Sequence, residues 1–154
     1  MENKPPVIAV AGPTASGKSD LGLKLARCLG GEIVCMDSMQ IYRRMDIGTA
    51  KPTAQEQALV PHHMLDVADP TEAYAVADYA VAAEHVIDQI ISRGRLPILV
   101  GGTGLYLKAL MDGLSLGGAG GDERLRAELN AMADEPGGKE RLHARLAAVD
   151  PETA

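Results

Sequence analysis

The chain has 154 residues, which is enough for one α/β domain with a core of its own. Apolar residues make up 46% of the chain and charged residues 23%, as in an ordinary globular protein. The formal net charge of −6 excludes a domain that binds nucleic acid through an overall positive charge, so any RNA contact has to come from local basic residues or from another segment.

No stretch reaches the roughly 20 consecutive apolar residues of a membrane span, and the apolar start of the chain leads into a glycine loop instead of a signal-peptide cleavage site. We therefore expect a cytoplasmic protein with no membrane segment. Two cysteines, Cys28 and Cys35, are too few for a disulfide framework or a metal site, and we expect both to be buried free thiols.

Residues 7–11 predict a buried strand, and residues 18–29 predict a helix that stops at Gly30 and Gly31. The spacing of Leu21, Leu25 and Cys28/Leu29 indicates the face that this helix turns toward the core.

The loop between this strand and this helix has the pattern G-x-x-x-x-G-K-[ST], which is typical of phosphate-binding sites in that context. Its residues are Gly12, Pro13, Thr14, Ala15, Ser16, Gly17, Lys18 and Ser19. Glycines let backbone N–H groups converge on phosphate oxygens, and the N-terminus of the helix adds partial positive charge. Lys18 supplies a full charge, and the Ser19 hydroxyl can ligate Mg²⁺. We predict that this loop binds phosphate.

Residues 32–37, EIVCMD, predict a second strand that ends in a carboxylate, and the polar segment 38–52 after it predicts a functional loop. Asp37 could bind a metal ion indirectly, take a proton from an acceptor substrate, or cap a turn. Together with Ser38 and Gln40 it could also hydrogen-bond the edge of a nucleobase, although such residues also occur in ordinary turns.

The same loop carries a basic cluster of Arg43, Arg44 and Lys51, which either contacts phosphate or is an ordinary solvated surface. The next expected elements are a short helix with the capping box Thr53/Glu56, a third strand over residues 62–67, a long helix over 75–93 and a buried strand over 96–100.

Strands that alternate with helices predict an α/β fold: a P-loop NTPase-like parallel sheet covered by helices on both faces. Ligands of such sheets bind at the carboxyl ends of the strands, where the phosphate loop, Asp37 and residues 101–103 would meet. Phosphoryl-transfer enzymes of this class usually place an Asp at such a strand end to help hold Mg²⁺, but here the strand 96–100 runs into Gly101, Gly102 and Thr103. The loop therefore identifies a phosphate and leaves the reaction open.

Residues 1–113 are the expected catalytic core, and residues 114–154 the expected glycine-rich linker and beginning of a helical region that would bind tRNA or form an insertion. Two short helical patterns, residues 122–132 and 139–149, fall in this second part.

Several motifs occur in a fixed order: GPTASGKS, DSMQIYR, GTAKP, PHHMLD, YAVADY and LPILVGGTGLYLKAL. Together they resemble the amino-terminal half of the tRNA dimethylallyltransferases, also called tRNA isopentenyltransferases. The resemblance runs over residues 7–149, nearly the whole chain. His62 and His63 belong to one of these motifs, and we expect them to have a structural role because no third ligand stands at metal spacing.

The resemblance implies transfer of a dimethylallyl group from dimethylallyl diphosphate to N6 of the adenosine 3′-adjacent to the anticodon in tRNA. The phosphate loop would then hold the donor's diphosphate, which leaves and is never transferred, in keeping with the missing strand-terminal Asp. Backbone N–H groups, Lys18 and a Mg²⁺ ion on Ser19 would stabilise the charge that builds up on the departing group.

The resemblance also implies roles for single residues. Asp37 matches the family's general base on the adenine amine, and Lys18 and Thr103 would complete the catalytic set. Ser38, Met39 and Gln40 match the segment that touches the adenosine, which has to leave its stack to reach the donor. Thr103 and Arg126 match tRNA-contacting positions. The implied partners are the tRNA anticodon loop and dimethylallyl diphosphate, and we expect a monomer.

The family continues into a basic segment with further tRNA-contacting residues, and this chain ends before it, so we expect the chain to be incomplete and weak or inactive alone. Two alternatives remain open. One is a P-loop kinase of small molecules or nucleosides that uses ATP, with Asp37 facing an acceptor hydroxyl. The other is a phosphate-binding fragment without catalysis.

Overall fold

The structure is a computed structural model that describes residues 6–112 and 122–154. The chain divides into two compact units, Met1–Leu114 and Ser115–Ala154. The glycine-rich segment expected to connect them falls on residues 113–121 and so lies outside the described residues.

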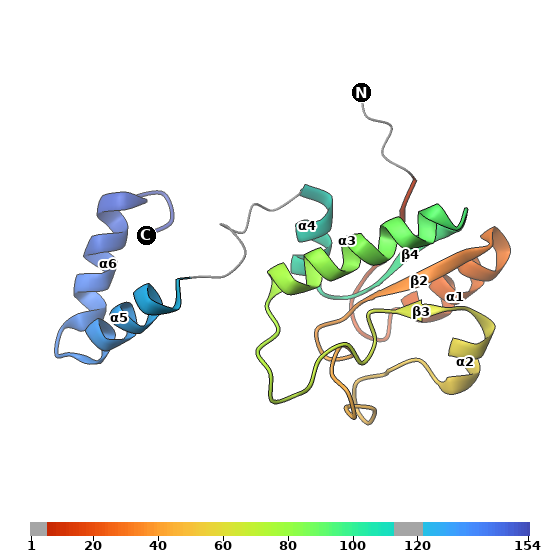
Figure 1. The fold of residues 1–154 in the computed structure, drawn as a ribbon, viewed down its shortest axis with the longest axis horizontal. Coiled ribbons are helices and arrows are strands. Elements are labelled where there is room, and N and C mark those ends of the chain that lie inside the picture. The colour runs from red at the N-terminus through yellow and green to blue at the C-terminus, as the bar shows by residue number, and fades with distance from the viewer. Residues whose placement is uncertain (1–5, 113–121) are drawn as a thin grey trace. The chain divides into compact units, whose positions relative to one another are not determined.

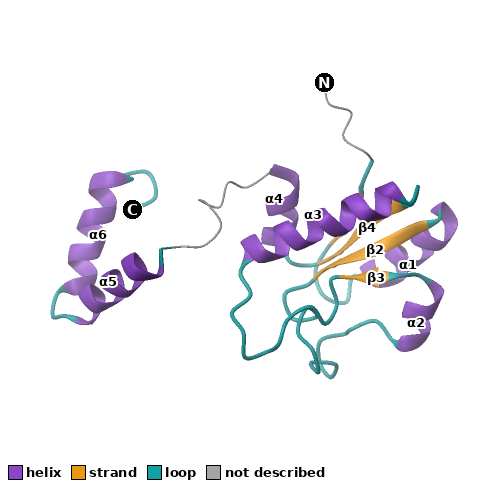
Figure 2. Ribbon diagram, in the orientation of Figure 1, coloured by secondary structure: helices purple, strands orange, loops and turns teal. Residues whose placement is uncertain are grey.

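The first unit is built on a four-stranded parallel sheet with the strand order β1-β4-β2-β3. Figure 2 shows β4, β2 and β3 side by side in that order. The strands are β1 (Ile8–Ala11), β2 (Gly31–Met36), β3 (His62–His63) and β4 (Leu96–Gly101). The helices of this unit are α1 (Lys18–Leu29), α2 (Ala54–Leu59), α3 (Val76–Ser92) and α4 (Gly104–Asp112).

Alternate residues of the strands face opposite sides of the sheet, and each side has its own core. Ile33 and Cys35 of β2 pack with Ala26 of α1 on one side. Val34 and Met36 pack on the other side with residues of α3 and α4. Helices therefore cover both faces (Figure 1), and the predicted α/β fold is confirmed.

Helix α1 meets the sheet through small residues. Gly22 and Ala26 are its buried positions, and a Cβ at Gly22 would lie 2.5 Å from Cγ2 of Val100. Leu21 and Leu29 are each 51% exposed, and Cys28 is exposed as well. The expected inward face is therefore correct for Leu25, which packs against the core, and wrong for Leu21 and Leu29. The expected burial of Cys28 is wrong as well, because the helix approaches the sheet most closely where its side chains are smallest. Cys35 is buried as expected.

The third strand is shorter than residues 62–67, since only His62–His63 pair with β2. Met64 and Asp66 have φ angles of 61° and 55°, which an extended strand cannot accommodate. The capping box of Thr53 and Glu56 begins α2 as predicted.

Helix α3 matches the predicted long helix and buries Tyr79, Ala83 and Ile90. The ring of Tyr79 stacks on that of Tyr106 with 3.8 Å between centroids, which packs α3 against α4. Helix α4 itself was not among the predicted elements.

The second unit contains α5 (Glu123–Asp134) and α6 (Gly138–Val149), in agreement with the two predicted helices. The Asp122 side chain caps α5 by accepting from the N–H groups of Arg124 and Leu125. Among the helices of the described residues, none has the length and apolar character that a bilayer crossing requires.

Candidate functional site

The phosphate loop lies between the end of β1 and the start of α1, as its motif predicts. Gly17 at the N-cap of α1 has a φ of 80°, and Ala15 has a φ of 64°, so the backbone turns sharply here. The Lys18 ammonium donates to the Pro13 carbonyl over 3.0 Å and so folds back over its own loop. A phosphate in the loop would compete for this ammonium group.

A cleft of about 510 Å³ opens beside this loop, within the size range of small-molecule sites. The phosphate loop lines one side of it, including Lys18 and Ser19. Asp37, Met39 and Gln40 line it beyond the end of β2. The site lies at the carboxyl ends of the strands, where the fold class predicts it.

Asp37 has two carboxylate oxygens with different surroundings. Its Oδ1 accepts from the N–H of Met39 at 2.9 Å and from the N–H of Gln40 at 3.4 Å, so it caps the turn after β2. Its Oδ2 has no hydrogen bond to any of the residues that the structure describes. The turn-capping interpretation of Asp37 is thus correct for one oxygen, while the other is available to a ligand.

Thr103 organises the segment that follows β2. Its N–H donates to the Met36 carbonyl at 3.2 Å, and its Oγ1 accepts from the N–H of Ser38 at 3.1 Å. Asp37, Ser38 and Thr103 are therefore neighbours, as predicted. Neither Ser38 nor Thr103 belongs to the lining of the cleft.

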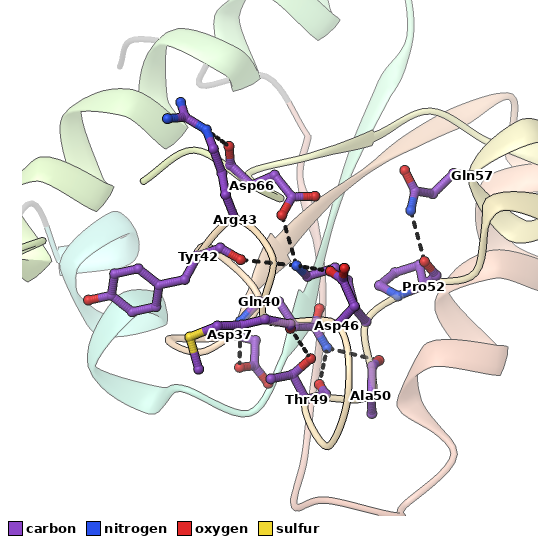
Figure 3. Close-up of polar contacts among 12 residues, drawn as sticks. Asp37, Gln40, Tyr42, Arg43, Asp46, Thr49, Ala50, Pro52, Gln57 and Asp66 are labelled. Carbon is purple, nitrogen blue, oxygen red and sulfur yellow. Dashed lines mark hydrogen bonds and ion pairs between the residues drawn. The ribbon is translucent and has the colours of Figure 1, made fainter. Parts of the chain in front are cut away.

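The side-chain amide nitrogen of Gln40 uses both of its N–H bonds within the protein. Nε2 donates to the carbonyls of Thr49 and Ala50, both at 3.0 Å (Figure 3). With both N–H bonds in use, Oε1 remains as an acceptor. These contacts fold residues 48–52 over the cleft, so that Thr49, Ala50 and Pro52 form part of its wall.

Some of the lining residues were not among the predicted site residues, notably Ile33, Cys35, His62 and Val100. Burial, together with the charge of Asp37, raises the pKa of the Cys35 thiol to about 12, so this wall is neutral at physiological pH. Burial also lowers the pKa of His62, whose Nδ1 contacts the Val60 carbonyl at 2.8 Å. The alternation of β2 carries a signal for Ile33 and Cys35, since both face α1.

The basic cluster of the loop makes internal contacts. Arg43 donates to the carbonyls of Asp66 and Val67, and Arg44 pairs with Asp69 at 2.6 Å. The side chain of Lys51 is 5% exposed and pairs with Asp46 and Asp66. The solvated-surface interpretation is wrong for Lys51, because its ammonium is enclosed by the fold.

Two further predicted positions lie away from this loop. His63 Nε2 contacts Glu32 Oε2 at 2.7 Å, which ties β3 to β2 in the way a structural role requires. Arg126 lies in α5 of the second unit with its side chain exposed. Its predicted contact with tRNA stays a prediction.

The oxygen atoms of the cleft suit a magnesium ion that is held mainly by the phosphate oxygens of a bound substrate and by water. In the described part of the chain, no group of three or more His, Cys, Asp or Glu side chains could hold a metal by itself. Mg²⁺ commonly takes one or two protein oxygens and completes its shell with water and phosphate oxygens. Ser19, Asp20 and Asp37 line the same cleft and can supply such oxygens, so the residues fit the ion.

The comparisons with known proteins agree on one family. The family model described as "IPP transferase" matches residues 40–154. A tRNA dimethylallyltransferase of Halorhodospira halophila is 56% identical over 97% of this chain and 47% of its own length. One from Pelotomaculum thermopropionicum is 52% identical over 98% of this chain and 48% of its own length.

Solved structures give the same result. The full-length tRNA isopentenylpyrophosphate transferase of Bacillus halodurans is 48% identical with a TM-score of 0.70, covering 96% of this chain and 48% of that one. A eukaryotic dimethylallyltransferase acting on tRNA is 32% identical with a TM-score of 0.76, covering 96% of this chain and 36% of that one. The chain spans about half the length of the curated relatives that it matches.

Proposed function

The chain belongs to the IPP transferase family, and we propose on that premise that it is the donor-binding and catalytic part of an enzyme that prenylates tRNA. The reaction would move a dimethylallyl group from dimethylallyl diphosphate to N6 of the adenosine 3′-adjacent to the anticodon. One observation carries the proposal: the phosphate loop lines the same cleft as Asp37, whose Oδ2 has no hydrogen bond within the described part of the chain. An anchored donor and a proton acceptor can therefore meet the same reacting atoms.

On the donor side, Gly12 to Ser19 would hold the diphosphate through backbone N–H groups, with Lys18 turning from Pro13 toward a phosphate oxygen. Ser19 would hold Mg²⁺, which would supply positive charge to the leaving pyrophosphate. The N-terminus of α1, which has no side-chain cap, would add partial positive charge to the same effect.

On the acceptor side, the bond between the allylic carbon and the diphosphate oxygen breaks while a bond from that carbon to N6 forms. Asp37 would accept the proton that N6 loses, and pyrophosphate would leave with the electron pair of the broken bond. The predicted tRNA contacts are Ser38, Met39, Gln40, Thr103 and Arg126. The remaining contacts would come from the half of the relatives' length that this chain does not span.

The test uses residues 1–154 joined to the carboxyl-terminal half of the Halorhodospira halophila relative, called the extended chain below. Incubation with dimethylallyl diphosphate and unmodified tRNA should give prenylated adenosine and pyrophosphate, detected by mass spectrometry of the digested RNA. Formation of ADP from ATP with no prenylated adenosine would instead identify the kinase alternative. Binding of the diphosphate without either product would indicate a binding module.

A further inference from the structure

The side chain of Lys51 is almost inaccessible to solvent, and its ammonium group has a complete set of partners. Its Nζ donates to the Tyr42 carbonyl at 3.0 Å, to Asp46 Oδ1 at 2.7 Å and to Asp66 Oδ1 at 2.8 Å (Figure 3). Three donors meet three acceptors, which uses the whole capacity of an ammonium group. Burial alone would lower the pKa of Lys51, but the two aspartates outweigh it and raise the pKa, so the group is charged.

The three partners come from separate stretches of backbone. Tyr42 and Asp46 belong to the loop after β2, and Asp66 belongs to the segment after β3. The N–H of Asp66 also donates to the Gln40 carbonyl, and the N–H of Arg43 to the Ala68 carbonyl. Lys51 therefore lies where the loop after β2 is fastened to the segment after β3.

The backbone around Lys51 is in conformations that need such support. Arg44, Ala50, Met64 and Asp66 all have positive φ angles although none is glycine. Residues with side chains adopt this region only at a cost that surrounding contacts have to offset. The loop would relax to other conformations without contacts that hold it.

This fastened loop is also a wall of the cleft. Thr49 and Ala50 accept from Gln40, and Lys51 follows them directly in the chain. If Lys51 releases Asp46 and Asp66, the carbonyls of Thr49 and Ala50 lose their fixed place opposite Gln40. Within the described residues, the hydrogen bonds of the Lys51 ammonium go to Tyr42, Asp46 and Asp66, and none goes to the phosphate loop. The donor side of the cleft would therefore keep its shape.

We propose that Lys51 is a positioning residue: through Asp46 and Asp66 it holds residues 48–52, the wall of the cleft beside Gln40, in the conformation that receives the RNA base. The inference rests on the proposed function and adds a role for a residue that touches no substrate. It separates two effects: loss of Lys51 should weaken use of tRNA and leave use of the diphosphate donor nearly unchanged.

The variant Lys51→Met tests this in the extended chain, since a methionine keeps most of the length and removes the charge. The aspartates it leaves behind are 67% and 46% exposed and can be hydrated, so the variant should fold. The matched control is Arg44→Met, which removes a cation of the same loop that is 76% exposed and pairs with Asp69. The expected result is a KM for tRNA raised about tenfold or more, with the KM for dimethylallyl diphosphate within about twofold.

A second measurement does not depend on activity. Amide hydrogen exchange of residues 40–52 and 66–68 in the 154-residue chain should become faster in Lys51→Met than in the wild type or in Arg44→Met, with unchanged affinity for pyrophosphate. If the wild-type extended chain transfers nothing, the proposed function fails. Amide exchange and pyrophosphate affinity then still decide whether Lys51 holds the loop.

Several outcomes would overturn the inference. One is a Lys51→Met variant whose exchange in these segments equals that of the wild type. Others are an unchanged KM for tRNA, an equal rise in both KM values, or equally fast exchange in Arg44→Met.

Discussion

Asp37 shows at the scale of one residue how a single carboxylate can combine a structural contact with the general-base role that we propose for it. Oδ1 holds the turn through the N–H groups of Met39 and Gln40, and Oδ2 accepts no hydrogen bond from the residues that the structure describes. The two functions can be separated because asparagine retains an oxygen that can cap the turn but loses the charge and the basicity.

We expect Asp37→Asn in the extended chain to lower the rate of transfer by about 10²- to 10⁴-fold, the usual contribution of a general base. Affinity for dimethylallyl diphosphate should change little, because the phosphate loop is intact. Asp37→Ala should abolish transfer as well and in addition loosen the turn. Single-turnover kinetics with separate measurement of donor binding checks this, and a variant that loses only tRNA affinity would contradict the assigned role.

Lys18 should act on the donor first. Since a hydrogen bond to a charged group contributes about 1.5–3 kcal/mol, Lys18→Ala should weaken pyrophosphate binding in the presence of Mg²⁺ by about 10- to 100-fold. Calorimetry on residues 1–154 measures this. Lys24→Ala is the control, because Lys24 is an exposed lysine of the same helix. Equal losses in the two variants would mean that Lys18 acts only through overall charge.

At the scale of elements, the contact between α1 and the sheet depends on a missing side chain. Gly22→Ala would bring a methyl group to 2.5 Å from Cγ2 of Val100. We expect a loss of about 1–3 kcal/mol in the free energy of unfolding, the usual cost of overpacking, reduced by the better helix propensity of alanine.

The control for this prediction is Gly104→Ala at the start of α4, where an added Cβ meets nothing within 4 Å. That variant should be as stable as the wild type or slightly more stable. Urea unfolding followed by circular dichroism compares the two variants, and equal stabilities would show that α1 can shift away from the sheet without cost.

The same helix shows why sequence patterns predict some elements better than others. A spacing of 3.6 residues identified α3 and its buried face, because large apolar residues fill that face. In α1 the pattern singled out Leu21, Leu25 and Leu29, of which Leu25 packs against the core, but the buried positions are Gly22 and Ala26, whose small size carries no hydrophobic signal. The end of β3 could not be predicted either, since positive φ angles at Met64 and Asp66 arise from tertiary contacts.

The site follows the same division. The phosphate loop and Asp37 were predictable because each is a local pattern next to a strand. The alternation of β2 could have indicated Cys35, and His62 reaches the cleft from β3. Pro52 could not be predicted, because it reaches the cleft only once residues 48–52 have folded back onto Gln40 and Tyr42.

At the scale of the whole molecule, Glu32 joins three elements. This buried carboxylate of β2 contacts His63 of β3 and, at 2.8 Å, Arg93 at the end of α3. Burial alone would raise the pKa of Glu32, but the hydrogen bonds and charges of Arg93 and His63 outweigh it, so the pKa lies below its usual range.

A carboxylate whose pKa is lower in the folded state stabilises the fold above its ordinary pKa, and this contribution disappears as the pH falls through the folded value. We therefore expect the free energy of unfolding of residues 1–154 to decrease on acidification below about pH 5. Glu32→Gln should have a lower free energy of unfolding at pH 7, and this free energy should depend less on pH in the acid range. Urea unfolding between pH 7 and pH 4 checks this, and parallel curves for the two proteins would exclude Glu32 as the cause.

The span of the chain leads to a further expectation. Residues 1–154 cover about half the length of the relatives, and their net charge of −6 offers little attraction for RNA. We expect this piece to bind pyrophosphate about as well as the extended chain does and to prenylate tRNA far more slowly. Turnover of the two proteins under the same conditions measures this, and comparable rates would refute it.

The strand order β1-β4-β2 fixes the distance between the two sides of the cleft. Because β4 lies between them, the loop after β1 and the carboxylate after β2 are separated by two strand spacings, about 10 Å. Position 101, at the tip of the intervening strand, is a glycine, so this position adds no side chain to the gap. The two reactants themselves have to span this distance. This favours a donor that is anchored by an elongated polar tail and an acceptor base that projects from its RNA strand.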